Sequence, residues 1–124
     1  MSNTILSEQG FHAEQNRDST LNVHFSKAVF WLDAEYLHWG RKMGKESGFL
    51  EAQEIEKVEN YGRIQDHTFT FRVIPKLKAE NFQIFSCESQ AKVNEWIHKV
   101  SEVAHIPCEL PKGDVSTLIA DALP

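Results

Sequence analysis

Phe82 to Ala104, which reads FQIFSCESQAKVNEWIHKVSEVA, combines an alternating strand with one amphipathic helix. Phe82 and Ile84 fall on one side of the strand, and a short polar turn follows it. Apolar residues then recur at steps of three and four, which places them on one helical face: Val93, Trp96, Ile97, Val100 and Ala104. Ser89 is a suitable N-cap for the helix, and His105-Ile106-Pro107 ends it. The pattern predicts a buried Trp96 at the centre of a helix that closes the domain.

The length and composition are those of one soluble globular domain, with 124 residues of which 41% are hydrophobic and 25% charged. No apolar run approaches the ~20 residues that a membrane-spanning helix needs. Residues 1–4 (MSNT) have neither the plan of a secretion signal nor a glycine at position two for myristoylation. Cys87 and Cys108 lack metal-ligand spacing, so we interpret them as reduced thiols of a cytoplasmic protein.

The net charge of −5 argues against a general nucleic-acid binder, which would be basic overall. The charges are unevenly distributed, because residues 47–66 are acidic overall and residues 67–80 are basic overall. Arg41, Lys42 and Lys45 form a second basic cluster. This distribution indicates a polarised surface with localised basic loops, although scattered solvated charges would fit the same counts.

Alternation of apolar and polar residues locates the expected strands. Residues 1–20 are weakly patterned, so we expect a loosely held N-terminal segment there. Leu21, Val23 and Phe25 alternate with polar residues, which predicts the first strand. Further apolar runs predict strands at Ala28–Leu32 and Tyr36–Trp39, a glycine-rich loop at 40–48, and a strong strand at His67–Ile74 that Pro75 ends.

Two other segments have a mixed or a turn-forming composition. Residues 49–58 are ambiguous, because their Glu, Ala, Gln and Lys content favours a helix by intrinsic propensity. Asn60-Tyr61-Gly62 predicts a turn, and residues 76–81 predict a hairpin loop.

The C-terminal tail contains a second amphipathic pattern at residues 114–122 (DVSTLIADA), with Asp114 as N-cap. A helix this short is not stable unsupported, so we expect it to dock on the domain, with partner pairing and fraying as the alternatives. The expected organisation is a loosely held segment at 1–20, a domain at 21–106 and an extension at 107–124.

The order and spacing of these elements over residues 21–104 resemble a pleckstrin homology (PH) domain. The segments that carry the resemblance are Phe30–Asp33, Tyr36–Trp39, Ile55-x-x-Val58, Phe69–Val73 and Phe82–Ser86, with Trp96 at the position of the family's helix Trp. The resemblance implies a mainly β fold, namely a bent, partly open antiparallel barrel of seven strands plugged at one end by the helix. It also implies that residues 49–58 form two short strands.

PH domains that bind inositol phosphates tightly usually carry a Lys near the end of strand one and a basic-x-Arg pair in strand two. This sequence departs from that pattern, because Ala28 stands two residues before Phe30, and His24 or Ser26 stands where the strand-one Lys is expected. The resemblance nevertheless implies a peripheral membrane module that binds anionic phospholipid through basic loops at the open barrel end. The expected contacts are Lys27, Arg41, Lys42 and Lys45, with Arg72 and Lys76 as further candidates.

We expect the basic residues to bind an anionic membrane with low affinity. A basic residue near an anionic surface contributes roughly 1 kcal/mol, so four give about 4 kcal/mol and a dissociation constant near the millimolar range. Recruitment then needs a second signal, such as an acyl chain, a dimer or a larger host protein. A sparse site suits phosphatidic acid better than a trisphosphate, and the chain resembles in outline the acylated PH-domain proteins that sense phosphatidic acid.

Two alternatives stay open. PH-like barrels also bind peptides by strand addition between the fifth strand and the helix, and the acidic segment 51–59 and the helix 114–122 would then form the partner surface. The domain could also serve only as a scaffold within a larger signalling enzyme. Trp39 and Met43 lie near the basic loop, where they either insert among lipid headgroups or pack beneath the loop, and we expect Trp39 to pack.

Catalysis is not expected from this sequence. It contains no GxSxG, P-loop or dinucleotide fingerprint, and its histidines show no HExxH or other metal-ligand spacing. Acidic pairs such as Glu51 and Glu54 are better explained as a solvated face. We therefore expect a non-enzymatic module without a metal or cofactor.

Overall fold

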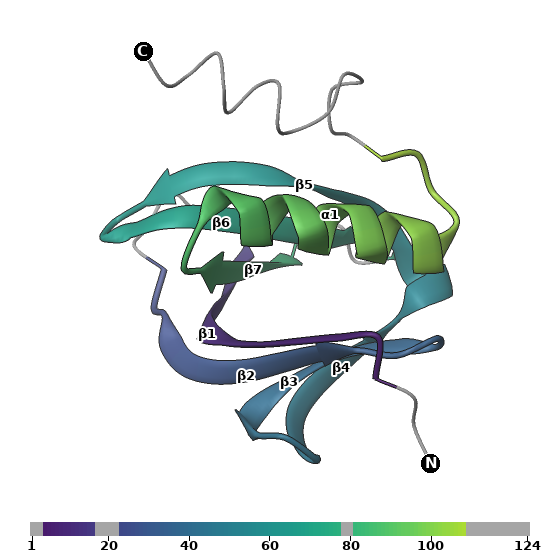
Figure 1. Ribbon diagram of the computed structural model, residues 1–124, viewed down its shortest axis with the longest axis horizontal. Helices are drawn as coiled ribbons and strands as arrows, with labels where there is room; N and C mark the ends of the chain where they lie inside the picture. Colours follow the sequence, from purple (N-terminus) through teal and green to yellow (C-terminus); the bar gives the residue numbers. More distant parts are fainter. Residues whose placement is uncertain (1–3, 17–22, 78–80, 109–124) are drawn as a thin grey trace.

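Seven antiparallel strands and one helix make up the computed structural model, which describes residues 4–16, 23–77 and 81–108 (Figure 1). The elements are β1 (Leu6–Asn16), β2 (Ser26–Leu32), β3 (Tyr36–Lys42), β4 (Lys45–Glu51), the 3₁₀ turn η1 (Ala52–Glu54), β5 (Ile55–Ile64), β6 (His67–Pro75), β7 (Asn81–Cys87) and α1 (Gln90–Ala104). The predicted fold class is therefore confirmed, while the predicted helix at 114–122 lies outside the described residues.

The strands form one sheet in the order β4-β3-β2-β1-β7-β6-β5, with β1 joining its two halves. β1 pairs with β2 over Leu6–His12 and with β7 over Phe11–Asn16. Gly10 lies next to the point where β1 passes from one half to the other, and a Cβ atom there would collide with the carbonyl oxygen of Ser86. Figure 1 shows α1 lying across the β5–β7 half, with β2, β3 and β4 forming the other half.

The prediction that the first strand begins at Leu21 is wrong, because β1 occupies Leu6–Asn16 within the segment expected to be loosely held. Its inward positions after Leu6 carry Glu8, Gly10 and His12, so the strand has no apolar alternation to reveal it. Val23 and Phe25 belong to a small cluster around Ala13, Ile74, Phe82 and Ile84 instead of a strand.

Two predicted turns differ from the structure. Asn60-Tyr61-Gly62 lies within β5, where the register with β6 shifts and Gly62 adopts a φ of +76°, so the local signal marks a bulge. The expected loop at 40–48 is a tight hairpin whose turn is Met43-Gly44 between β3 and β4. The two short strands expected within 49–58 are confirmed as the end of β4 and the start of β5, separated by η1.

The main core lies between α1 and the sheet and has Trp96 at its centre. Trp96 is fully buried and its ring centroid lies 4.9 Å from that of Phe30 and 5.9 Å from that of Phe71. Ser89 caps the helix as predicted, since its side chain accepts a hydrogen bond from the backbone N–H of Lys92. His105 ends the helix in the left-handed conformation. The predicted helix that closes the domain is therefore confirmed.

Candidate functional site

A basic hollow of about 990 Å³ lies beside the β3–β4 hairpin. Its wall is built from three segments, which are Ser7–Phe11 of β1, Ser26–Val29 of β2 and Arg41–Met43 at the hairpin turn. Three of the cations expected from the sequence, Lys27, Arg41 and Lys42, therefore border one concave surface. Lys45 pairs with Lys42 across the hairpin, so it lies next to the hollow without bordering it.

Strand register explains how these cations meet. Ala28 and Phe30 are buried, so Lys27 and Val29 take the outward positions of β2. Val29 pairs with Gly40 of β3. This pairing brings Lys27 of β2 close to Arg41 and Lys42, which follow Gly40. A Cβ atom at Gly40 would collide with the carbonyl oxygen of Lys45, so glycine allows the hairpin strands to approach closely at this irregular register.

The four cations are available for a ligand. Lys27, Arg41, Lys42 and Lys45 are all exposed, and none forms an ion pair with a carboxylate in the part of the chain that the structure describes. Glu8 is the acidic residue of the wall. Its carboxyl interacts with Trp96 and Lys92 on the helix side, and burial raises its pKa. The hollow therefore concentrates positive charge that an anion can neutralise.

Arg72, a further candidate from the sequence, is engaged elsewhere. Its guanidinium donates a hydrogen bond to Glu59 and lies 4.6 Å from the ring centroid of Tyr61 and 4.8 Å from that of Phe82. Burial acts to raise the pKa of Glu59, but the hydrogen bonds and positive charges of Arg72 and Lys57 together outweigh it and the pKa is lowered. Arg72 therefore holds β5, β6 and β7 together and does not border the hollow.

Lys76 does not border the hollow either. Its side chain is exposed, and its backbone N–H donates a hydrogen bond of 2.8 Å to the carbonyl of Glu54 in η1. The structure thus brings together four of the six predicted residues. It also adds polar groups that the sequence did not suggest, namely Ser7, Gln9 and Ser26. Ser7 and Gln9 were missed because β1 itself was not recognised.

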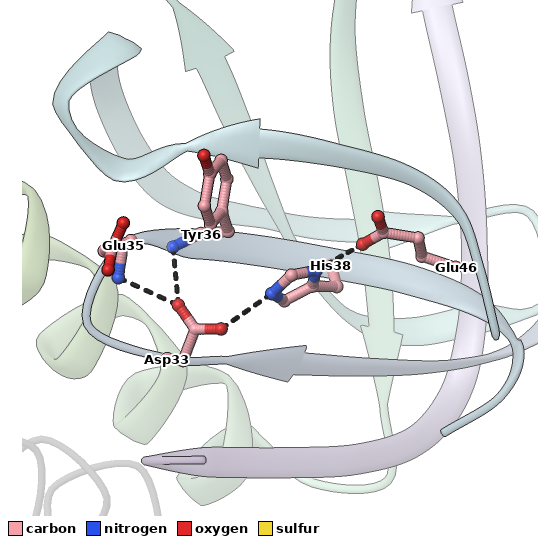
Figure 2. A network of polar contacts seen from close by, with 5 residues as sticks. All are labelled: Asp33, Glu35, Tyr36, His38 and Glu46. Atoms are coloured by element: carbon pink, nitrogen blue, oxygen red, sulfur yellow. Dashed lines mark hydrogen bonds and ion pairs between the residues drawn. The ribbon is translucent and has the colours of Figure 1, made fainter. Parts of the chain in front are cut away.

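A polar network lies on the same half of the sheet, at Asp33, His38 and Glu46 (Figure 2). The His38 ring sits between the two carboxylates and stacks on Trp31, with ring centroids 5.0 Å apart. Asp33 also accepts hydrogen bonds of 2.8 Å from the backbone N–H groups of Glu35 and Tyr36, which fixes the β2–β3 turn. Burial alone would lower the pKa of His38, but the hydrogen bonds to Glu46 and Asp33 raise it.

The described residues provide no metal site, no activated thiol and no membrane-spanning helix. No group of His, Cys, Asp and Glu side chains within 4–16, 23–77 and 81–108 is placed to hold a metal ion. Cys87 is buried and unpaired, and burial together with Glu8 raises the pKa of its thiol, which disfavours the nucleophilic thiolate. In this same part of the chain, no helix is both long and apolar enough to cross a bilayer.

Comparison with known proteins identifies the architecture. No protein-family model and no curated protein matches the chain. A solved structure of the Slm1-PH domain in complex with inositol-4-phosphate aligns with a TM-score of 0.60 and 17% identity, covering 81% of this chain and 96% of that chain. The chain has the pleckstrin homology fold. The Slm1-PH domain in complex with phosphoserine aligns with a TM-score of 0.62 and 18% identity, covering 82% of this chain and 96% of that one.

The PH domain of the human KIAA0053 protein gives a similar result, with a TM-score of 0.60, 18% identity, and coverage of 85% of this chain and 92% of that chain. Within the PH fold, the assignment of strands changes one expectation. β1 ends at Asn16, so His24 and Ser26 do not stand near the end of the first strand. Ala28 is buried in β2, which leaves Lys27 as the basic side chain of that strand.

Proposed function

We propose that this PH-fold chain is a non-catalytic module that binds anionic phospholipid headgroups at the cytoplasmic surface of membranes and recruits its host protein there for signalling. The observation that carries the proposal is the basic hollow, where Lys27, Arg41 and Lys42 border one concave surface without an ion-pair partner among the described residues. Lys45 extends the charge across the hairpin. The Slm1-PH domain, which shares the fold, has been solved with inositol-4-phosphate and with phosphoserine.

The chemistry of the hollow favours a phosphomonoester. Its cations are few, and serine and glutamine side chains from β1 and β2 supply neutral hydrogen-bonding groups beside them. Both ligands of the Slm1-PH structures carry a single phosphomonoester group. Phosphatidic acid and a monophosphorylated phosphoinositide present the same group on a membrane. Phosphatidic acid is the simpler fit, because it brings no inositol ring that would need further contacts.

Affinity through these cations alone is weak. Four basic residues at about 1 kcal/mol each give a dissociation constant near the millimolar range. The proposal therefore includes a second membrane signal, supplied by an acyl anchor, an oligomer or another part of the host protein.

Vesicle sedimentation tests the proposal directly. Vesicles of neutral lipid are compared at low salt with vesicles that also contain phosphatidic acid, phosphatidylserine or one phosphoinositide. Selective pelleting with a single headgroup is the expected result. Pelleting in proportion to vesicle charge would show that the headgroup is not recognised, and an absence of pelleting with every lipid, at lipid concentrations above the expected millimolar dissociation constant, would overturn the proposal.

Charge reversal locates the site. Arg41→Glu combined with Lys42→Glu should abolish pelleting without lowering the melting temperature, because both side chains are exposed and form no ion pair with another described residue. Arg63→Glu combined with Lys99→Glu is the matched control, since it changes the net charge equally. Arg63 makes an exposed hydrogen bond to the carbonyl of Gln65, Lys99 makes a 3.9 Å surface pair with Glu102, and neither borders the hollow. Equal loss in both double variants would show nonspecific attraction instead of a site.

A second candidate function is binding of a peptide by strand addition. β5 is the last strand of the sheet and packs beside α1, so its outer edge has backbone groups that no other described strand uses. The acidic side chains along Glu51–Glu59 would then favour a basic partner. A protein ligand that binds equally well with and without lipid, and survives the Arg41/Lys42 reversal, would support this function over the first.

A further inference from the structure

Met43 occupies the tip of the β3–β4 hairpin, directly between the cations of the basic hollow. Arg41 and Lys42 precede it, Gly44 follows it with a φ of +84°, and Lys45 begins the returning strand. The side chain of Met43 is 46% exposed although it is one of the larger apolar residues of the chain. A two-residue hairpin turn normally carries small or polar residues, so turn geometry does not explain a methionine here.

The surroundings of Met43 restrict what can cover it. It borders the same hollow as Lys27, Arg41 and Lys42, and the exposed ring of Phe11 borders that hollow as well. A soluble phosphate compound would neutralise the cations and leave the methionine in water. An anionic lipid surface can bind the cations and also cover the Met43 side chain, because it places phosphate groups directly above an apolar layer.

We infer that Met43 penetrates the boundary between headgroups and acyl chains while the flanking cations hold lipid phosphates. This inference rests on the proposed function and extends it by assigning an apolar contact to the same site. The stems of Arg and Lys are themselves apolar, so the flanking residues can follow the hairpin tip while their charges remain among the phosphates.

The hairpin is built to hold this side chain in place. Midway along the hairpin, a Cβ atom on Gly48 would collide with the indole of Trp39, so the two strands pack closely there. Trp39 stacks on His12 with ring centroids 4.9 Å apart and contacts Phe85 at 5.7 Å. Trp39 is therefore part of the interior packing and the tip projects from a rigid base. Because the hairpin is already ordered, entry of Met43 into the lipid costs little conformational entropy.

Fluorescence at the tip tests penetration. Cys108→Ser removes the exposed thiol, Met43→Cys introduces one at the tip, and an environment-sensitive dye is attached there. The matched control carries the dye at Gln53→Cys in η1, which is exposed and lies beyond the opposite end of β4. On vesicles with phosphatidic acid, we expect a blue shift and quenching by acyl-chain quenchers for position 43 and neither for position 53.

Substitution at the tip separates penetration from charge. Met43→Ser should lower the vesicle partition coefficient by roughly tenfold, the effect of losing part of a buried methionine side chain. Met43→Leu, which conserves apolar character, should keep the wild-type value. The ratio of the Ser and Leu partition coefficients should stay constant as salt is raised moderately, while both values fall because exposed charge interactions are screened.

The outcomes distinguish the two proposals. Vesicle binding by the wild-type chain with no blue shift at position 43, or with equal binding by the Ser and Leu variants, would overturn penetration and leave headgroup binding standing. An absence of vesicle binding by the unlabelled wild-type chain would overturn both.

Discussion

The Nε2 atom of His38 lies 2.8 Å from the carboxylate of Asp33, while its Nδ1 atom faces the carboxylate of Glu46 on the other side (Figure 2). Both ring nitrogens can donate hydrogen bonds only when the imidazole is protonated. The geometry therefore favours a positively charged histidine that ties the β2–β3 turn to β4. The network also keeps the Glu46 carboxylate paired with His38, although Glu46 is adjacent in sequence to Lys45 of the basic hairpin.

This arrangement makes part of the stability depend on pH. The pKa of His38 is raised above its ordinary value of 6.5, so its contribution is complete below pH 6.5 and is lost as pH rises through the folded-state pKa. His38→Gln should lower the free energy of unfolding by about 1–3 kcal/mol at pH 6. Urea unfolding at pH 6 and pH 9 should show the difference from wild type shrinking at the higher pH. A difference that does not change with pH would contradict the charged network.

His12 should show the opposite pH dependence. It lies against Trp39, its Nε2 donates a 2.6 Å hydrogen bond to Oε1 of Gln83, and burial lowers its pKa below 6.5 despite that bond. The unfolded chain therefore binds a proton more readily, and stability is lost as pH falls from about 6.5 toward the folded-state pKa. Wild type should lose more unfolding free energy between pH 7 and pH 5 than His12→Gln does. An NMR titration in which His12 titrates at or above 6.5 would contradict this prediction.

Replacement of the central helix residue should have the largest effect on stability. Trp96→Ala should lower the free energy of unfolding by about 3–5 kcal/mol, because it leaves a cavity between the helix and the sheet. Trp96→Phe should cost clearly less, because a phenyl ring fills part of the space that alanine leaves empty. Thermal melts of both variants check the prediction. An unchanged melting temperature for Trp96→Ala would refute the packing of α1 on the sheet.

Arg72 provides a test of which cations serve the hollow. Arg72→Gln removes the ion pair with Glu59 and the cation–π contacts, so it should lower stability by roughly 1–3 kcal/mol. Its vesicle binding, measured at a temperature where the variant is folded, should equal that of wild type. Loss of vesicle binding in folded Arg72→Gln would show that Arg72 does contribute to lipid binding.

Gly10 should tolerate no side chain. In Gly10→Ala the new Cβ atom would meet the carbonyl of Ser86 and the ring of Phe30, which should destabilise the chain by at least ~2 kcal/mol. Gly44→Asn is the control, because its position is open and Asn tolerates a positive φ; it should cost less than about 1 kcal/mol. Equal unfolding free energies for the two variants would show that β1 does not pass this close to β7.

Several elements follow from local sequence alone. The spacing of Val93, Trp96 and Val100 predicts α1, because the helix buries one side and exposes the other. Alternation also predicts β6 and β7, although the structure buries β7 on both of its faces. The composition of residues 49–58 favours a helix, but the structure places these residues in two strands and the short turn between them. There the pairing of each strand with a neighbour outweighs intrinsic propensity.

β1 and the grouping of the cations depend on tertiary structure. The inward residues Glu8, Gly10 and His12 are accommodated by side chains and backbone from β2, β3, β7 and α1, so no local pattern of β1 reveals a strand. Arg72 is equally basic in the sequence as Lys27, yet its neighbours on β5 and β7 neutralise and cover it. The sequence gives the position of each charged residue. Whether that residue forms an ion pair or stays exposed to solvent depends on strand register and on contacts between residues distant in the sequence.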